Sequence, residues 1–395
     1  MAREIAITLY LFVFRCIFYI CKLFPQKKKT TFVASFGENV LFTMKALERQ
    51  IDDHPIVLIT TPQCKIDFQH RPNRTLLRFD RSHILEWFRS IYHLATSETI
   101  FIDNYYGFLA ATPFHPGVRC IQLWHATGAI KQFGLLDPTN RQRTSRANQR
   151  FQVVYNRFDH IVVGSEKMAA VFAESFGLPE DRMLYTGVPR TDLFFDEVEK
   201  ASITSYLRQE LPMIKDKQVI LYAPTFRDGA LHDTKLSLDI DKMYREFGDA
   251  YILLLRLHPA INGTYQNKHP GFVVNVSGYH SVNHLLLITD LLITDYSSIP
   301  FEFALLNRPT IYFAHDLEQY AENRGFWEDY DVLVPGPIVT SMNELIQAIH
   351  LQHFDNQALA NFRTAWNRYA DGQASDRLIE AIYEVETTER VAQRV

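Results

Sequence analysis

Four polar clusters follow short apolar runs of the sequence, where a parallel sheet would present side chains to a ligand. His125 comes directly after the run CIQL and begins a loop that contains Gly128. Because an imidazole titrates near neutral pH, His125 could be a general base for a hydroxyl nucleophile. A histidine that only stabilises the fold is an equally good interpretation of this position taken alone.

The next two clusters carry cationic groups. Thr225 and Arg227 lie just after a predicted strand. The guanidinium of Arg227 could hold a phosphate through two hydrogen bonds. A salt bridge with the adjacent Asp228 is the alternative. His258 and Arg256 follow another apolar run, and alternation along a strand turns them to the same side. A ligand-facing His258 and a core histidine bonded to the backbone both remain open.

The fourth cluster is the strongest candidate for a binding site. A strand-like run leads into Asp295, and Ser297 and Ser298 then begin a helix whose first turn accommodates Pro300. Backbone N–H groups, two hydroxyls and the positive end of the helix predict an anion site suited to a diphosphate. Glu302 lies about one turn further and could accept hydrogen bonds from ribose hydroxyls. N-capping explains the serines alone, but not the arrival of several polar groups at strand ends in one half of the chain.

The elements that must position these clusters form two series of alternating strands and helices. The first series contains TTFVAS, HPIVLIT, TIFIDN, CIQLWHA and HIVVGS, and the second contains QVILYAPT, AYILLLRLHP, FVVNV, DLLITD and PTIYFAHD. Such alternation predicts an α/β fold with two doubly wound domains, each with its ligand beyond the carboxyl ends of the strands. We expect domains over 26–200 and 201–355, and a helical segment over 356–395 that packs back on the first domain.

Residues 1–25 form a separate apolar segment, followed by the basic run Lys27–Lys29. On a helix, Glu4, Arg15 and Lys22 fall on one narrow polar stripe. A membrane-spanning helix would bury Arg15 near the bilayer centre, at a cost of roughly 2.5–3.5 kcal/mol. We therefore predict a peripheral helix on the cytoplasmic face of the bacterial membrane, with the stripe among anionic headgroups. A buried first helix of the globular domain is the alternative.

Composition excludes several other classes of protein. The 395 residues carry 41 Lys and Arg against 45 Asp and Glu, a net charge of -4, which argues against a nucleic-acid partner. The four cysteines form no C-x-x-C pair, so neither a disulfide framework nor a zinc site is expected. Phosphate-loop and G-x-G-x-x-G motifs are absent from the sequence. We expect no tightly bound metal, although Mg²⁺ could accompany a phosphorylated donor.

Taken together, the motifs resemble the CDP-glycerol glycerophosphotransferases of wall teichoic acid synthesis. The resemblance runs in order from about residue 30 to the C-terminus, and its motifs are WHATGAIKQFG (124–134), VGSEKMAAVF (163–172), TGVPRTD (186–192), YAPTFRD (222–228), RLHP (256–259) and TDYSSIPFEFALLNRP (294–309). Each motif is weak alone, whereas the ordered set is specific. The apolar leader and the stretch KQFGLLDPTNRQRT most resemble the glycerol-phosphate primases of the family.

The resemblance implies a GT-B fold, in which two Rossmann-like domains face a cleft. It also implies transfer of sn-glycerol 3-phosphate from CDP-glycerol to undecaprenyl-diphosphate-linked ManNAc–GlcNAc, with release of CMP. By the family's pattern, His125 is the catalytic base and Arg227 and His258 contact the diphosphate. The donor-binding segments then contain Thr225, Asp295, Ser297, Ser298 and Glu302. A transferase that extends a primed glycerol- or ribitol-phosphate chain, and a GT-B glycosyltransferase using a sugar nucleotide, are the alternatives.

Overall fold

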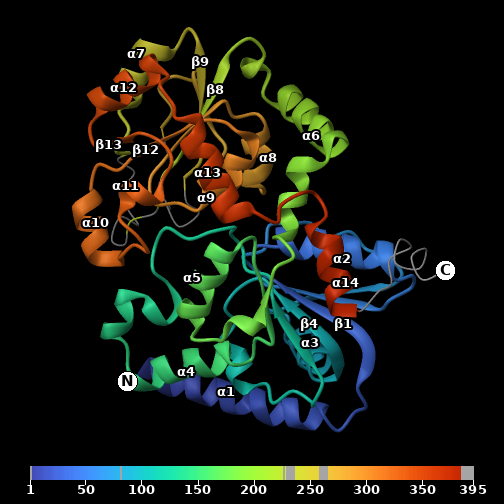
Figure 1. Ribbon diagram of the computed structural model, residues 1–395. Helices are drawn as coiled ribbons and strands as arrows, with labels where there is room; N and C mark the ends of the chain where they lie inside the picture. Colours follow the sequence, from blue (N-terminus) through green and yellow to red (C-terminus); the bar gives the residue numbers. More distant parts are fainter. Residues whose placement is uncertain (1, 81, 226, 228–235, 258–265, 384–395) are drawn as a thin grey trace, which may run out of the picture. The chain divides into compact units, whose positions relative to one another are not determined.

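The computed structural model describes residues 2–80, 82–225, 227, 236–257 and 266–383 (Figure 1). Contacts divide the chain into two compact units. The first comprises 1–125, 133–192 and the chain from Tyr369 on, and the second comprises 126–132 and 193–368. Each unit contains one parallel sheet with helices packed against it, which confirms the predicted α/β fold class.

The first unit contains a seven-stranded parallel sheet in the order β3-β2-β1-β4-β5-β6-β7. Its strands are β1 Lys27–Ala34, β2 Ile56–Thr60, β3 Arg74–Arg78, β4 Ser97–Ile102, β5 Arg119–Gln122, β6 His160–Val162 and β7 Met183–Leu184. Its main helices are α1 Ala2–Cys21, α2 Glu38–Gln50, α3 Ile84–Thr96, α4 Ser145–Tyr155, α5 Glu166–Phe176 and α14 Ala374–Tyr383. Phe32 and Ala34 alternate along β1 and share one buried core with α2 and α14.

The second unit contains a six-stranded parallel sheet in the order β10-β9-β8-β11-β12-β13. Its strands are β8 Gln218–Ala223, β9 Tyr251–Leu255, β10 Val273–Asn275, β11 Leu291–Thr294, β12 Thr310–Phe313 and β13 Ile338–Val339. Its helices are α6 Glu197–Glu210, α7 Ile240–Phe247, α8 Val282–Leu287, α9 Ile299–Phe303, α10 Leu317–Arg324, α11 Tyr330–Leu333, α12 Met342–Leu351 and α13 Asn356–Asn367.

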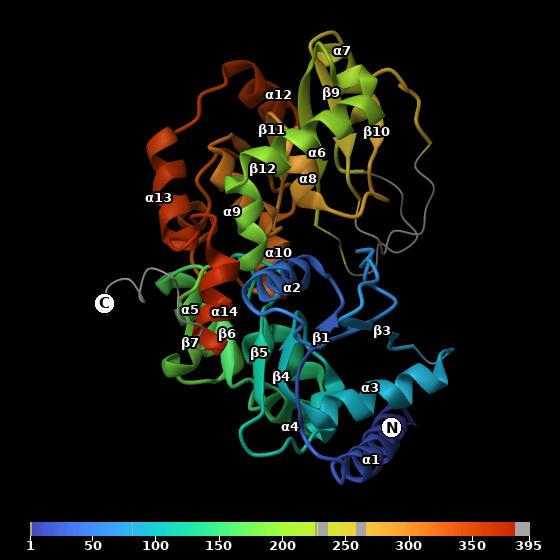
Figure 2. The same cartoon turned by 90° about the vertical axis from the view of Figure 1, so that its right-hand side faces the viewer.

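Alternate residues of the second sheet enter two different cores. Ile220 and Leu253 pack with α7 and α12, whereas Leu221 and Ile252 pack with α6 and α8. Strands covered on both faces must be apolar at nearly every position, which explains the continuous runs seen in the sequence. The second unit is therefore doubly wound (Figure 2).

The C-terminal helices belong to different units. Helix α13 lies in the second unit, while α14 lies in the first and packs on α2. The carboxylate of Asp192 accepts hydrogen bonds from the backbone N–H groups of Ala374 and Ser375, both at 2.9 Å. A carboxylate at the beginning of a helix satisfies otherwise unpaired donors, so Asp192 fixes where α14 begins.

Helix α1 packs on the first unit through Phe14 and Phe18, which are fully buried, and its polar stripe lies along the edge of this packed face. Glu4 pairs with Arg150 of α4 at 3.1 Å, and Arg15 donates to the carbonyl of Ala110 at 2.7 Å. Lys22 donates to the carbonyl of Phe114 at 3.3 Å. The stripe therefore bonds to the protein while Arg15 stays exposed, and its place among headgroups stays a prediction.

The opposite side of α1 is apolar and exposed. Its exposed side chains include Ile5, Leu9, Phe12 and Ile20, and Leu23, just after the helix, is also exposed. Among the described helices, Arg3–Cys21 is the segment long and apolar enough to cross a membrane, and 17% of it is buried.

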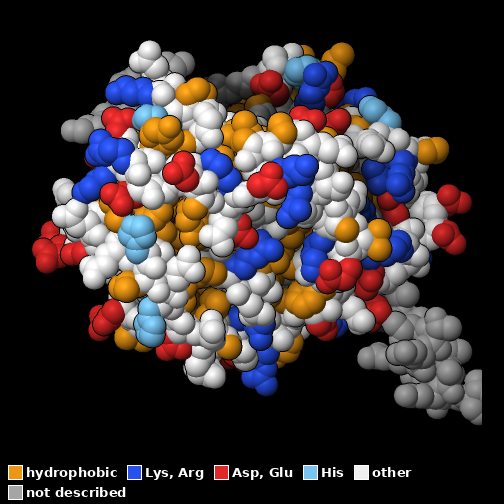
Figure 3. All heavy atoms as spheres, turned by 90° about the horizontal axis from the view of Figure 1, so that it is seen from above, with side chains coloured by type: hydrophobic (Ala, Val, Ile, Leu, Met, Phe, Trp, Pro, Cys, Tyr) orange, Lys and Arg blue, Asp and Glu red, His pale blue; other side chains and the backbone are white. Residues whose placement is uncertain are grey.

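Charges of both signs mix on the molecular face shown in Figure 3. Lys and Arg side chains lie among Asp and Glu side chains there. This distribution agrees with a net charge close to zero for the whole sequence. A mixed charged surface of this kind is typical of globular domains in water.

Candidate functional site

His125 follows β5 on a backbone that few residues adopt. Trp124 has a φ of +56°, in the left-handed region that bulky side chains rarely occupy. The Trp124 ring stacks on the imidazole with centroids 4.4 Å apart, and Phe36 also stacks on it at 3.9 Å. The two aromatic rings therefore fix the plane of the imidazole.

A backbone carbonyl determines the tautomer of His125. Nδ1 lies 2.9 Å from the main-chain oxygen of Asp103, and a carbonyl can only accept a hydrogen bond. The proton therefore resides on Nδ1 and the lone pair on Nε2. Burial lowers the pKa of His125 to about 4; the bond to Asp103 opposes this shift, and the charge of Arg190 adds to it. This pKa is lower than the near-neutral value expected from the sequence, and the ring is a neutral acceptor at pH 7.

Asn39 holds the segment that carries the histidine. Its amide nitrogen donates to the carbonyls of Leu123 at 3.1 Å and Trp124 at 2.9 Å. Its amide oxygen accepts from the backbone N–H of Arg190 at 3.0 Å. Arg190 also pairs with Glu38 at 3.3 Å, and both side chains are largely buried.

Sequence reasoning did not single out Asn39, Glu38 or Arg190 as site residues. The first two follow the strand-like run TTFVAS, and Arg190 lies inside the motif TGVPRTD. For Glu38 and Asn39, the position after a predicted strand was the available signal, because the carboxyl ends of parallel strands meet at one edge of a sheet. For Arg190, the signal was its place in the motif.

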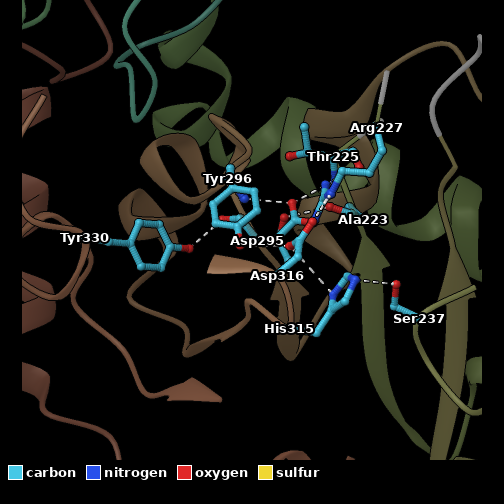
Figure 4. A network of polar contacts seen from close by, with 10 residues as sticks. Ala223, Thr225, Arg227, Ser237, Asp295, Tyr296, His315, Asp316 and Tyr330 are labelled. Carbon is cyan, nitrogen blue, oxygen red and sulfur yellow. Dashed lines mark hydrogen bonds and ion pairs between the residues drawn. The ribbon is translucent and has the colours of Figure 1, made fainter. Parts of the chain in front are cut away.

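In the second unit, Arg227 is the centre of a polar network (Figure 4). Its Nε donates to Asp316 at 2.7 Å, and one terminal nitrogen donates to both Asp295 at 2.9 Å and Asp316 at 2.9 Å. The other terminal nitrogen donates to the carbonyl of Thr225 at 2.7 Å. The alternative considered for Arg227 was a salt bridge with Asp228. Asp228 lies outside the described residues.

Two carboxylates thus surround one guanidinium. Burial lowers the pKa of Arg227, but hydrogen bonds and charges of Asp316 and Asp295 raise it well above its ordinary value. Burial raises the pKa of Asp316, yet hydrogen bonding and the charge of Arg227 leave it below its usual range. The positive charge of Arg227 is already countered within the protein, so it is less available to a diphosphate than the sequence suggests.

Aromatic rings pack around the same network. The guanidinium carbon of Arg227 lies 5.0 Å from the ring centre of Tyr296 and 4.9 Å from that of Tyr320. The hydroxyl of Tyr296 donates to Asp316 at 3.0 Å. Sequence reasoning missed Asp316, which lies 89 residues after Arg227 and just beyond β12.

Asp295 joins the ends of β8 and β11. One carboxylate oxygen accepts from the backbone N–H groups of Thr225 and Tyr296, both at 2.7 Å. Its main-chain oxygen accepts from the hydroxyl of Tyr330 at 2.9 Å. The structure therefore brings Thr225, Arg227 and Asp295 together. His258, predicted for the same site, lies outside the described residues.

Several hydroxyls lie at this edge of the second sheet. The buried Oγ1 of Thr225 has no hydrogen-bond partner among the described residues. Ser297 and Ser298 are half-buried and precede α9, whose first turn holds Pro300 as predicted. The Oγ of Ser297 accepts from the backbone N–H of Ile299 at 3.2 Å, while the Ser298 side chain makes no capping bond. Glu302 is only 1% exposed, so its carboxylate is covered by protein.

The glycine of the WHATG motif packs directly on α9. A Cβ atom built on Gly128 would lie 2.5 Å from Cδ1 of Phe301, which is closer than real Cβ contacts. Gly128 and Phe301 belong to two different motifs, and the structure places them together in the second unit.

Within the described ranges, no three His, Cys, Asp or Glu side chains converge as a metal site would require. The residues of the Arg227 network already bond one another. An Mg²⁺ ion arriving with a phosphorylated donor stays a prediction.

Comparison with known proteins places this chain among teichoic acid enzymes. Residues 17–384 match the family described as CDP-Glycerol:Poly(glycerophosphate) glycerophosphotransferase. A teichoic acid glycerol-phosphate primase of Bacillus subtilis (strain 168) is 32% identical over 381 residues, 96% of this chain and 98% of the relative. A teichoic acid poly(ribitol-phosphate) polymerase of Bacillus spizizenii is 37% identical over 80% of this chain, but only 51% of that relative is matched.

A solved structure shows that the fold is shared. The wall teichoic acid polymerase TagF superposes with a TM-score of 0.80 over 97% of this chain and 98% of that chain, at 24% sequence identity. The chain has the predicted GT-B-type fold, with two α/β units. It is a polyol-phosphate transferase of teichoic acid synthesis. This chain therefore belongs to the CDP-glycerol:poly(glycerophosphate) glycerophosphotransferase family.

Proposed function

We propose that this enzyme transfers sn-glycerol 3-phosphate from CDP-glycerol to undecaprenyl-diphosphate-linked ManNAc–GlcNAc and releases CMP. The acceptor hydroxyl oxygen attacks the β-phosphorus of the donor, and the bond between that phosphorus and the bridging oxygen breaks. The electron pair of the broken bond leaves with CMP. The acceptor proton must go to a base, and the neutral imidazole of His125 offers an acceptor lone pair on Nε2.

The fixed tautomer of His125 is the structural observation that carries the catalytic proposal. A histidine that serves only the fold has no need for a ring with one nitrogen bonded and the other available. Here Nδ1 is bonded to a carbonyl, and stacked aromatic rings hold the plane. Preorganisation of this kind places the lone pair without further ordering during the reaction.

The second unit is proposed to hold the donor. The hydroxyl of Thr225, which has no hydrogen-bond partner among the described residues, and the hydroxyls of Ser297 and Ser298 can donate to phosphoryl oxygens, as in other phosphoryl transfers. Arg227 and Asp295 keep this segment in place through their ion pair at 2.9 Å. From the family pattern, His258 is proposed as a further diphosphate contact.

The priming role is supported by the extent of similarity. The match with the glycerol-phosphate primase extends over 98% of that relative, while that with the poly(ribitol-phosphate) polymerase extends over 51%. The higher identity with the polymerase, 37% against 32%, favours a second candidate, transfer of ribitol phosphate to a primed chain.

Peripheral membrane association is proposed from the two apolar helices. Helix α1 contacts α3, whose Ile84, Leu85 and Phe88 are exposed beside the apolar side of α1. Crossing a bilayer would require α1 to break the bonds of Glu4 and Arg15 with the first unit. Lying in the cytoplasmic interface keeps these bonds and places apolar side chains in the acyl boundary, next to an acceptor whose lipid stays in the membrane.

Acceptor-dependent release of CMP by the purified chain tests the function. CDP-glycerol is compared with CDP-ribitol and with UDP-sugars, and lipid-linked disaccharide is compared with an acceptor that already carries glycerol phosphate. Turnover with CDP-glycerol and the unprimed acceptor is expected. Turnover only with primed acceptor would replace priming by extension, and release of UDP from a UDP-sugar would indicate a glycosyltransferase.

A further inference from the structure

The turn between β1 and α2 holds an internal carboxylate in an unusual way. Asp103, directly after β4 and fully buried, accepts from the backbone N–H groups of Ser35 at 2.8 Å, Phe36 at 2.9 Å and Gly37 at 2.7 Å. The hydroxyl of Tyr106 donates to it at 2.8 Å. Four donors thus converge on one side chain.

This turn is where many α/β domains bind a phosphate, because consecutive N–H groups and the beginning of a helix favour an anion. Here the three N–H groups of residues 35–37 are already occupied by the carboxylate of Asp103. Gly37 has a φ of +90°, and a Cβ there would lie 2.7 Å from Ile66, so no other residue fits this turn easily. The turn is therefore closed by the protein itself and serves another purpose.

The contacts of the turn with His125 indicate what that purpose is. Phe36, the central residue of the turn, stacks on His125 with ring centres 3.9 Å apart and an interplanar angle of 11°. The main-chain oxygen of Asp103 accepts from Nδ1 of the same imidazole. Asp103 thus restrains His125 in two ways. Its carboxylate holds the turn that places the Phe36 ring against the imidazole, and its main-chain oxygen determines that Nδ1 carries the proton.

We propose that Asp103 is a positioning residue for the transfer reaction, which keeps Nε2 of His125 unprotonated and aimed at the acceptor hydroxyl. The inference rests on the proposed function, in which Nε2 receives the acceptor proton. Asp103 itself touches no substrate. Its carboxylate acts through the turn at Phe36, and its carbonyl acts through Nδ1.

The test uses Asp103→Asn in the full-length chain. An amide has one oxygen in place of two and presents N–H groups to N–H donors, so the turn loses its support while the side-chain volume is kept. We expect kcat to fall at least about tenfold, while KM for CDP-glycerol changes less than about twofold. Tyr106→Phe is the matched control, because it removes one donor to Asp103 and leaves the turn bonded; its kcat should stay within about threefold of the parent.

A spectroscopic measurement separates this role from a purely structural one. In protein labelled with ¹⁵N-histidine, the His125 signals are assigned by their loss in His125→Asn. The parent should show a protonated Nδ1 and an unprotonated Nε2. Asp103→Asn keeps the main-chain oxygen of residue 103 but loosens the turn whose Phe36 ring holds the imidazole in place, so it should show a mixture of tautomers. If Asp103→Asn fails to fold, Phe36→Leu, which keeps the turn but removes the stacked ring, should show the same loss of kcat at constant KM.

The outcomes distinguish this inference from the proposed function. Full activity of His125→Asn would overturn the catalytic role of His125, whereas the tautomer spectrum still tests the positioning by Asp103. Inactive His125→Asn together with parental kcat and an unchanged ¹⁵N spectrum in Asp103→Asn would overturn the positioning role alone.

Discussion

The main-chain oxygen of Asp103 lies 2.9 Å from Nδ1 of His125 and so leaves Nε2 as the acceptor nitrogen. The imidazole is half-buried, and the loss of solvation around it lowers its pKa to about 4. A base with this pKa is already neutral throughout the physiological range. It gains a proton only when the acceptor hydroxyl loses one, and the negative charge of a bound donor would favour that protonated form.

Substitution of His125 should remove turnover and leave donor binding intact. His125→Asn keeps a side-chain donor toward Asp103 but offers no basic nitrogen, so kcat should fall by roughly 10²- to 10⁴-fold. In the parent enzyme, kcat/KM should stay level as pH falls from 8 to about 5, because the free imidazole titrates near 4. CMP release and calorimetric binding of CDP-glycerol measure the two effects. Loss of donor binding in the variant, or an acidic limb near pH 6.5, would contradict this role.

Arg227 should act through its carboxylate partners. Arg227→Lys cannot make the paired bonds to Asp316 and Asp295, so KM for CDP-glycerol should rise several-fold and the second unit should lose about 1–3 kcal/mol of stability. Asp316→Asn should likewise raise KM for CDP-glycerol and lower the stability of the second unit. Arg363→Lys is the control, because its exposed guanidinium makes a hydrogen bond to Asn307 in the same unit. Parental KM and melting temperature in Arg227→Lys would refute the assignment.

The close approach of Gly128 to Phe301 predicts a steric defect. Gly128→Ala places a methyl group 2.5 Å from the ring, so the chain must shift, at a cost of about 1–3 kcal/mol of unfolding free energy. Gly271→Ala provides the matched control, since a Cβ there meets nothing within 4 Å. Denaturant unfolding compares the two variants. Addition of Phe301→Leu should restore part of the loss, and equal stability of Gly128→Ala and Gly271→Ala would be inconsistent with the packing.

The pH dependence of stability follows from a buried basic pair. Nζ of Lys29 lies 3.0 Å from Nδ1 of His93, and burial, followed by the charge of Lys29, lowers the pKa of His93 from 6.5 to about 4. Between these values the unfolded chain binds a proton at His93 that the native chain does not bind. The free energy of unfolding should therefore fall as pH drops from 6.5 to 4. Urea unfolding at pH 7, 5.5 and 4.5 measures the slope, which should be smaller in His93→Gln and unchanged by substitution of the exposed His70.

The fold was predictable because buried parallel strands require long apolar runs. Ile220 and Leu221 point to opposite faces of β8, and both are buried. The continuous apolar run QVILYA therefore indicates by itself a strand that is covered on both faces. The helix that follows Ser297 and Ser298 was also predictable from nearby residues, since Pro300 fits only the first turn of a helix.

The partners of the site residues could not be predicted in the same way. Asp316 meets Arg227 across 89 residues, and Asp103 meets Gly37 across 66, so each pair exists only once the sheets have formed. The contacts of α1 could not be predicted for a related reason. The spacing of Glu4 and Arg15 defines a polar stripe, but the bond from Arg15 to the carbonyl of Ala110 joins segments 95 residues apart.

The exposed sides of α1 and α3 should determine binding to lipid. Leu85→Glu and Leu23→Glu place a charge where 77% and 84% of the side chain is exposed, so folding should be unaffected while insertion into the interface is penalised. Val198→Glu on α6, 82% exposed, is the matched control. Flotation with vesicles of phosphatidylglycerol and phosphatidylcholine should show several-fold weaker binding for the first two variants only. Equal binding of all three, or binding that depends on salt and not on Leu85 and Leu23, would mean that basic residues alone hold the enzyme at the membrane.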